Sequence, residues 1–183
     1  ETATSLAGRK GGFRLFYGLF TGMMFVTLLY TLMVHSVLKH RFLLAYGAFT
    51  ASMMLLGLSW GGGFFGVLEG FTTLDQVRMN FVAVALALAS ATWFLISFVE
   101  PEMLSAKARQ RLLGFALLPL AVALGRNLNL AWEWRLIDSL LITSFTASII
   151  ALYATALLAV RRGSASARLL LVGWTLPALV GVA

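Results

Sequence analysis

Apolar residues in this chain form long runs that are separated by short polar segments. A helix needs roughly 20 apolar residues to cross a hydrocarbon core of about 30 Å. Four charge-poor runs reach that length, and they cover residues 15–34, 42–68, 79–99 and 139–160. The pattern therefore predicts several transmembrane α-helices.

Two further runs are less complete. Residues 112–125 form a shorter run between the third and the last of these four, and it is the fourth predicted span along the chain. Pro119 lies in its middle, and Arg126 follows it directly. Its extension to residue 132 would require Arg126 to snorkel toward the interface or to face a polar cavity. A sixth run begins after Arg168 and is still apolar at Ala183. We expect an all-α polytopic transmembrane bundle with five complete spans and a truncated sixth of seven.

The domain organisation expected from this pattern is one membrane-spanning domain over residues 1–183. The chain begins with Glu1 instead of a methionine, and it stops inside the apolar run 169–183. We therefore expect a fragment of a longer protein.

Composition supports a membrane environment. The 183 residues are 60% hydrophobic and 11% charged, and their mean hydropathy is +0.90. A soluble domain carries roughly a quarter charged residues. The net charge of +7 then fits basic loops that face anionic lipid better than a nucleic-acid surface. We expect the lipid bilayer as a partner and no nucleic acid.

The distribution of basic residues predicts an orientation. Eight lie on one side: Lys39, Arg41, Lys107, Arg109, Arg111, Arg161, Arg162 and Arg168. Six lie on the other: Arg9, Lys10, Arg14, Arg78, Arg126 and Arg135. Without the three near the N-terminus, the second group falls to three. We therefore expect the first group to face the cytoplasm and the N-terminus to lie outside.

Chemistry-bearing residues are sparse. No Asp, Glu, Lys or Arg lies centrally in the five complete runs, whereas pumps and ion-coupled transporters usually need such groups. Cysteine is absent, and His35 and His40 have no acid at metal-ligand spacing. No nucleophile elbow is present. We expect no catalytic residue, metal or cofactor, and therefore no enzyme.

Glycine spacings have structural interpretations here. Gly61, Gly63 and Gly66 satisfy G-x-G-x-x-G, but this run follows a predicted membrane helix instead of a strand. It therefore predicts a helix terminus or a closely packed exit. Gly18 and Gly22 form a G-x-x-x-G, which is either a helix-packing face or an incidental spacing.

Aromatic residues fall near the predicted interfaces, where they are normally anchors. Trp93 and Trp174 lie toward the inner surface, and Trp60, Trp132 and Trp134 toward the outer one. The outer group could instead line a ligand pocket with neighbouring polar residues. The candidate ligand-binding residues are Trp60, Glu69, Arg126, Asn127, Trp132 and Glu133.

Several short motifs occur in a characteristic order. They are F-Y-G-L-F at 16–20, L-L-Y-T-L at 28–32, K-H-R at 39–41, F-L-L-A-Y at 42–46, F-L-I-S-F at 94–98 before Glu100-Pro101, R-R-G at 161–163, A-R at 167–168 and G-W at 173–174. This series resembles the bacterial seven-transmembrane receptors with diverse intracellular signalling modules. Two departures are Thr31, where the family usually has Asn, and Phe42, where it usually has Tyr.

The resemblance implies a receptor in the bacterial inner membrane. Residues 1–183 would be its membrane-spanning sensor domain, with a periplasmic N-terminus and with flanking periplasmic and cytoplasmic domains that lie outside this sequence. Such proteins carry an extracytoplasmic sensing domain before the first helix and a cytoplasmic output, commonly a histidine kinase or a diguanylate cyclase, after the last. A homodimer is expected by analogy, and the small-molecule ligand is not specified. The alternative is a transporter for a small molecule or lipid, which would show repeat symmetry and broken helices. A membrane enzyme would need catalytic groups outside this segment.

Overall fold

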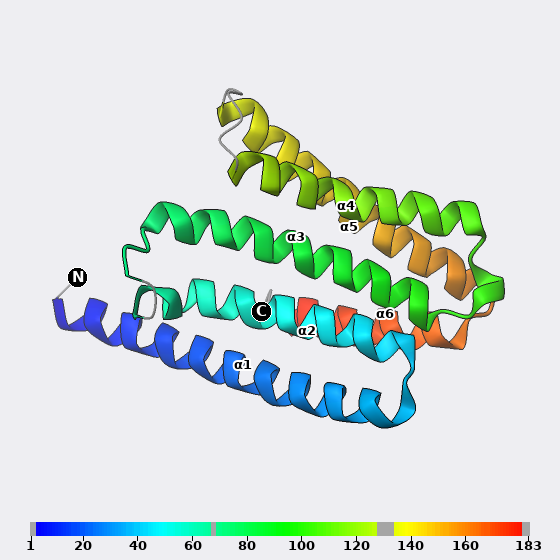
Figure 1. The fold of residues 1–183 in the computed structure, drawn as a ribbon, viewed down its shortest axis with the longest axis horizontal. Coiled ribbons are helices and arrows are strands. Elements are labelled where there is room, and N and C mark those ends of the chain that lie inside the picture. Colours follow the sequence, from blue (N-terminus) through cyan, green and yellow to red (C-terminus); the bar gives the residue numbers. More distant parts are fainter. Residues whose placement is uncertain (1–2, 67–68, 128–133, 181–183) are drawn as a thin grey trace. The chain divides into compact units, whose positions relative to one another are not determined.

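The computed structural model describes residues 3–66, 69–127 and 134–180, and these residues form helices and turns without a strand (Figure 1). The prediction of an all-α fold is thus confirmed. The element order is α1 (Ala3–Leu38), α2 (Arg41–Trp60), η1 (Gly63–Gly66), α3 (Thr73–Phe98), η2 (Pro101–Met103), α4 (Ala106–Asn127), α5 (Trp134–Arg161) and α6 (Ala165–Val180).

Among the described residues, five segments are long and apolar enough to cross a bilayer: Leu15–Leu38, Arg41–Trp60, Thr73–Phe98, Ala106–Asn127 and Leu136–Arg161. These correspond to the five predicted spans, including the weak fourth one. In α6 the apolar segment Ala165–Trp174 is shorter. A helix satisfies its own backbone hydrogen bonds, which is what a chain in lipid requires.

Two predicted boundaries differ from the observed helices. The apolar run 42–68 does not form one helix, because α2 ends at Trp60 and Gly62 adopts a positive φ of 71°. That left-handed conformation is accessible to glycine and ends the helix. In contrast, α1 extends 12 residues ahead of the predicted start at residue 15. The helix-terminus interpretation of the glycine-rich run is confirmed.

The chain comprises two compact units, residues 1–87 and 88–183. Each unit is described by itself. That the two units form the single membrane domain expected from the sequence stays a prediction.

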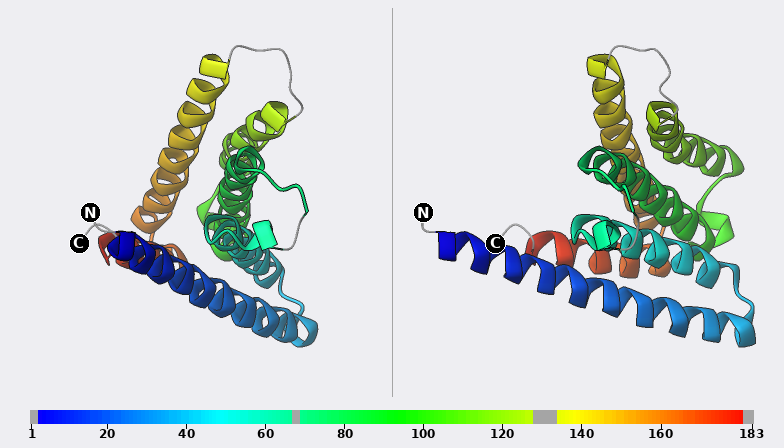
Figure 2. Two further views of the ribbon diagram at one scale, coloured as in Figure 1. Left: turned by 90° about the vertical axis from the view of Figure 1, so that its left-hand side faces the viewer. Right: turned by 60° about the vertical axis from the view of Figure 1, so that its left-hand side comes forward.

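In the first unit, α1 and α2 lie side by side and antiparallel (Figures 1 and 2). Lys39 has a positive φ of 52° at the turn between them, and its amide donates to the His35 carbonyl at 2.8 Å. The buried residues of α2 are all small: Ala45, Gly47, Thr50, Ser52, Gly57 and Ser59. Small residues allow two membrane helices to approach closely.

Close approach is visible at two glycines of α2. A Cβ atom on Gly57 would lie 2.7 Å from Thr21 Oγ1 and 2.9 Å from Phe20 Cδ1. A Cβ atom on Gly61 would lie 3.0 Å from Tyr17 Cβ. No larger side chain fits at these positions unless α1 shifts. The glycines that pack α1 against α2 therefore belong to α2.

The start of α3 is held to the end of α2 by reciprocal polar contacts. Gln76 Nε2 donates to the Ser59 carbonyl at 2.6 Å, and Ser59 Oγ donates to the Gln76 carbonyl at 3.3 Å. Thr72 caps α3, because its Oγ1 accepts from the Asp75 amide while Asp75 Oδ2 accepts from the Thr72 amide. These contacts fix the connection that follows the glycine-rich turn.

In the second unit, α5 packs against both α4 and α6. Residues buried at helical spacing form one stripe on α5: Ile137, Leu141, Ser144, Ser148, Leu152, Ala156 and Ala159. A matching stripe on α4 comprises Leu112, Ala116, Pro119 and Ala123. Spacings of three and four residues keep each stripe on one helix face. Two hydroxyl groups thus lie inside an otherwise apolar contact.

Candidate functional site

The connection between α3 and α4 binds the beginning of α6 through Glu100. Ser164 Oγ donates to Glu100 Oε2, while Ser166 donates to Oε1 from its hydroxyl at 2.8 Å and from its amide at 3.4 Å. Ser164 also caps α6, because its Oγ accepts from the Ala167 amide at 3.0 Å. A carboxylate at a helix N-terminus is favoured by the orphan amides and the helix dipole.

These hydrogen bonds change the acidity of Glu100, which lies between the membrane-spanning segments. Donation from the Ser164 hydroxyl, with further donation at Ser166, lowers the pKa of Glu100 from its ordinary 4.5 to about 2. The carboxylate is therefore ionised at neutral pH. Hydrogen bonds to an ionised acceptor are stronger than those between neutral groups.

Two arginines complete this connection. Arg162 Nη1 donates to the Met103 carbonyl at 2.8 Å, which joins the segment before α6 to η2. Arg109 Nη2 donates to the Pro101 carbonyl at 3.1 Å. We call Glu100, Arg109, Arg162, Ser164 and Ser166 the inner clamp. By charge counting, this cluster lies on the side that the sequence predicts to be cytoplasmic.

At the opposite ends of α4 and α5, Arg126 forms an ion pair. Its Nη2 lies 3.2 Å from Asp138 Oδ1, and its side chain is only 10% exposed. The structure gives Arg126, one residue before the end of α4, an acidic partner on the next helix. The extension of this span to residue 132, for which Arg126 would have to snorkel or face a polar cavity, falls on residues outside the described part of the chain. Asn127 Nδ2 donates to the Ala123 carbonyl in its own helix at 3.0 Å.

The six candidate ligand-binding residues fall in different parts of the chain. Trp60 is 52% exposed, and its ring meets Tyr17 edge-on with centroids 5.9 Å apart. Glu69 is exposed beyond η1. Both belong to the first unit, whereas Arg126 and Asn127 belong to the second. Trp132 and Glu133 lie outside the described residues. A shared ligand pocket for these residues stays a prediction.

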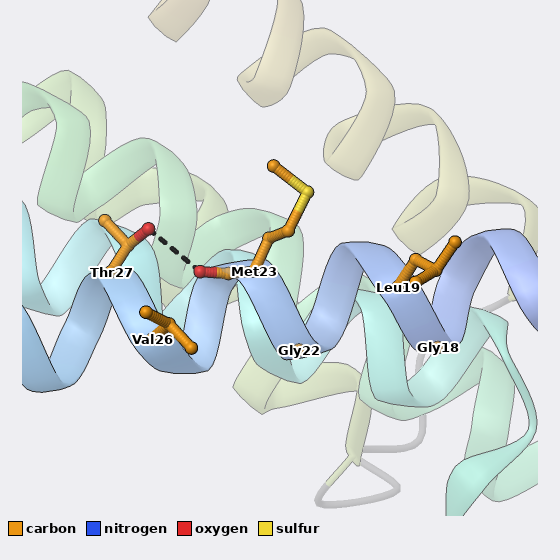
Figure 3. Close-up of a pocket in the computed structure, with 6 residues that line it drawn as sticks. All are labelled: Gly18, Leu19, Gly22, Met23, Val26 and Thr27. Atoms are coloured by element: carbon orange, nitrogen blue, oxygen red, sulfur yellow. Dashed lines mark hydrogen bonds between the residues drawn. The ribbon is translucent and has the colours of Figure 1, made fainter.

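Gly18 and Gly22 of α1 have open space beside them in the first unit. Neither glycine has an atom within 4 Å of an added Cβ. Together with Leu19, Met23, Val26 and Thr27 they line an open hollow of about 490 Å³ (Figure 3). The α1–α2 contact therefore does not use this spacing, and α2 supplies its packing glycines. That Gly18 and Gly22 pack against another helix stays a prediction.

The histidines make a local contact. His35 Nδ1 lies 3.2 Å from the His40 carbonyl oxygen across the α1–α2 turn. No group of three or more His, Cys, Asp or Glu that could hold a metal ion occurs among the described residues. The absence of a catalytic or cofactor site stays a prediction from the sequence.

Sequence reasoning missed the inner clamp and the ion pair. Glu100 was noted only in the motif Glu100-Pro101, and Asp138 was not paired with Arg126. A retrospective indication is the sequence S-x-S at 164–166 after a glycine, which is typical of a helix N-terminus. The carboxylate that binds this helix start, Glu100, lies 64 residues before Ser164, and only the tertiary fold brings the two together.

The fold defines the class of protein: it is a multi-pass helical membrane protein with polar connections at the helix ends. Residues 13–183 match the family described as 7TM diverse intracellular signalling. The chain belongs to this family and is a membrane receptor domain for signalling, associated with the bilayer and with intracellular signalling modules. No match was found among curated proteins or among solved structures.

Proposed function

We propose that this domain passes a periplasmic or membrane-borne signal to a cytoplasmic output domain such as a histidine kinase or a diguanylate cyclase. The family match over residues 13–183 is the observation that carries the proposal. The domain lies in the bacterial inner membrane with its N-terminus in the periplasm. A homodimer would present two output domains to each other.

The physical basis is a difference in affinity between two helix arrangements. A ligand, or a periplasmic domain that has bound one, shifts the population only if it binds one arrangement better than the other. The inner clamp supports this proposal, because hydrogen bonds of Glu100, Arg162, Ser164 and Ser166 join the α3–α4 connection to the α5–α6 connection. A displacement of α6 would therefore also displace the end of α3.

The six candidate residues at the outer face are the proposed ligand-binding residues. Trp60, Glu69, Arg126, Asn127, Trp132 and Glu133 would contact a small molecule, with Arg126 exchanging Asp138 for an anionic group of the ligand. The exposed ring of Trp60 and the ion pair of Arg126 support this proposal.

The experiment replaces residues 13–183 of the full-length protein with unrelated transmembrane helices of the same number and orientation. Output activity is then measured in membranes with and without the upstream sensing domain. We expect the exchanged protein to lose its response to the sensing domain while retaining basal output. An unchanged response would contradict a transmitting role.

The proposed orientation is tested separately by labelling single cysteines. A cysteine at Glu69, but not one at Arg162, should react with an impermeant maleimide applied from the periplasmic side.

A second candidate function is transport of a small molecule or lipid. Two interrupted apolar segments favour transport. Pro119 lies inside α4, and the second apolar run is divided after Trp60. Transporters use such interrupted helices at their binding sites. Uptake of a substrate into proteoliposomes that contain the protein would support transport over reception.

A further inference from the structure

The helix α1 continues well beyond its apolar segment. It begins at Ala3, whereas the segment that is long and apolar enough to cross a bilayer begins at Leu15. The residues before Leu15 therefore add about 18 Å of helix on the side of the N-terminus. Figures 1 and 2 show these first turns running past the end of α2.

Two adjacent glycines, Gly11 and Gly12, join this extension to the apolar segment. Both have the helical conformation, so the backbone requires glycine at neither position. A Cβ atom on Gly12 would meet no atom within 4 Å in the first unit. Glycine destabilises a helix relative to alanine, because it loses more backbone freedom when the helix forms. The glycine pair is therefore a weak point of α1, and sharp bends in helices occur at such pairs.

Basic residues flank the glycine pair. Arg9 and Lys10 precede it, Arg14 follows it, and residues 2–14 contain no acid. Lys and Arg residues next to a membrane segment are attracted to anionic lipid headgroups. The glycine pair lies within about 6 Å of the apolar segment along the helix axis. A bend at this point would bring the extension down to the level of the headgroups.

We propose that Gly11 and Gly12 form a joint at the membrane surface and that anionic lipid headgroups hold its bent position. In the straight position, α1 is one helix of about 54 Å from Ala3 to Leu38. In the bent position, residues 3–10 leave this axis and lie along the bilayer surface, where Arg9 and Lys10 contact headgroup phosphates.

The joint controls which displacements reach α2. In the straight position, a displacement at Ala3 moves the whole of α1, and the close contacts of Gly57 and Gly61 pass it to α2. In the bent position, residues 3–10 move without the rest of the helix. Tyr17, which meets α2 at Gly61, lies after the joint, so the α1–α2 contact is the same in both positions. The joint concerns α1 alone and holds whether the domain is a receptor or a transporter.

Pulsed electron paramagnetic resonance measures the joint in the full-length protein in lipid nanodiscs. Residues 1–183 contain no cysteine, and any cysteine outside them is replaced. Cysteines at Ser5 and Met23 place spin labels on opposite sides of the joint, and cysteines at Leu15 and Met33 give a control pair after the joint. Both pairs span 18 residues, which is about 27 Å of helix. Unlabelled protein is added in excess, so that distances within one chain are recorded.

The lipid composition should select the position of the joint. In phosphatidylcholine discs, both pairs should give one distance of about 27 Å. When anionic phosphatidylglycerol is included, the Ser5–Met23 pair should gain a second distance of about 20 Å, as a right-angle bend at the joint requires. The Leu15–Met33 pair should keep its single distance.

Substitution of the glycines tests the joint itself. Gly11→Ala combined with Gly12→Ala strengthens the helix at this point and should reduce the fraction of the short distance about tenfold. Gly18→Ala combined with Gly22→Ala adds the same two methyl groups to α1, where neither meets an atom within 4 Å in the first unit. This control should leave the fraction unchanged.

Substitution of the basic residues tests the contact with lipid. Arg9→Gln combined with Lys10→Gln should reduce the short-distance fraction in anionic discs about tenfold. Four results would overturn the proposal. They are a single distance of the Ser5–Met23 pair in anionic discs, an unchanged fraction in the alanine variant of the joint, an unchanged fraction in the glutamine variant, and a short distance produced by inorganic phosphate in phosphatidylcholine discs.

Discussion

The contacts inside the α1–α2 pair differ in kind from the contacts inside the second unit. In the first pair, Gly57 and Gly61 of α2 bring the backbone of that helix against side chains of α1, with no space for a Cβ. In the second unit, polar contacts join different elements: Glu100 with Ser164, the Ser148 hydroxyl with the Phe115 carbonyl, and Arg126 with Asp138. The α1–α2 contact depends on close packing, whereas hydrogen bonds and an ion pair join the elements of the second unit.

This difference separates a fixed part from an adjustable one. Close packing tolerates little displacement, because protein interiors are dense and added volume forces the backbone to move. Hydrogen bonds and ion pairs can be exchanged for others at modest net free energy. We therefore expect α1 and α2 to act as a rigid pair and the second unit to contain the parts that move in signalling.

The largest effect is expected at the glycine contact. Gly57→Ala places a Cβ 2.7 Å from Thr21 Oγ1, and the overpacking should lower the free energy of unfolding by about 2 kcal/mol. Gly18→Ala adds the same methyl group to a helix where nothing lies within 4 Å. Equilibrium unfolding in mixed micelles compares the two. Equal effects would show that the α1–α2 contact is not close-packed.

A smaller, pH-dependent effect is expected at the inner clamp. Because the folded-state pKa of Glu100 is lowered from 4.5 to about 2, its stabilising contribution is fully present above about pH 4.5. The contribution is lost as the pH falls toward 2, where the carboxylate becomes protonated in the folded state also. Glu100→Gln should therefore be less stable than the wild type at pH 7.

Thermal unfolding of the two proteins between pH 7 and pH 2.5 measures this effect. The difference in midpoint should shrink in the acid part of this range. Glu102→Gln alters an exposed acid in the same connection and should match the wild type throughout. A gap between Glu100→Gln and the wild type that is independent of pH would contradict the role assigned to the ionised carboxylate.

The smallest effect is expected at the ion pair. Asp138 is half-exposed, so a double-mutant cycle with Arg126→Gln and Asp138→Asn should give a coupling free energy of about 0.5–1 kcal/mol. Added salt should reduce it. Unfolding of the four proteins at low and high ionic strength provides the measurement. A coupling near zero at low salt would mean that charge does not hold these helix ends.

Much of the fold could be predicted because membrane helices have a strong local pattern. The apolar runs located five spans, including the one that contains Pro119, and the glycine-rich segment predicted the end of α2. The length of α1 was underestimated, because Arg9, Lys10 and Arg14 interrupt the apolar run although they do not interrupt the helix. Charge marks the limit of a span better than the limit of a helix.

Contacts between distant residues were much harder to predict. The sequence drew attention to Gly18 and Gly22, yet the packing glycines are on α2, because spacing alone does not say which face a helix turns toward its neighbour. Pro119 was recognised, but the sequence did not reveal that Ser148 lies opposite it. Such pairings depend on helix rotation and register, which a single sequence does not specify.

The most direct test of the account uses the full-length protein, with the output domain proposed above, in native-like membranes. Output activity is compared for the wild type, Glu100→Gln and the neighbouring control Glu102→Gln at equal membrane abundance. If the second unit transmits the signal through the inner clamp, Glu100→Gln will change the ratio of stimulated to basal output while Glu102→Gln keeps it. An unaltered ratio in Glu100→Gln would contradict transmission through this connection.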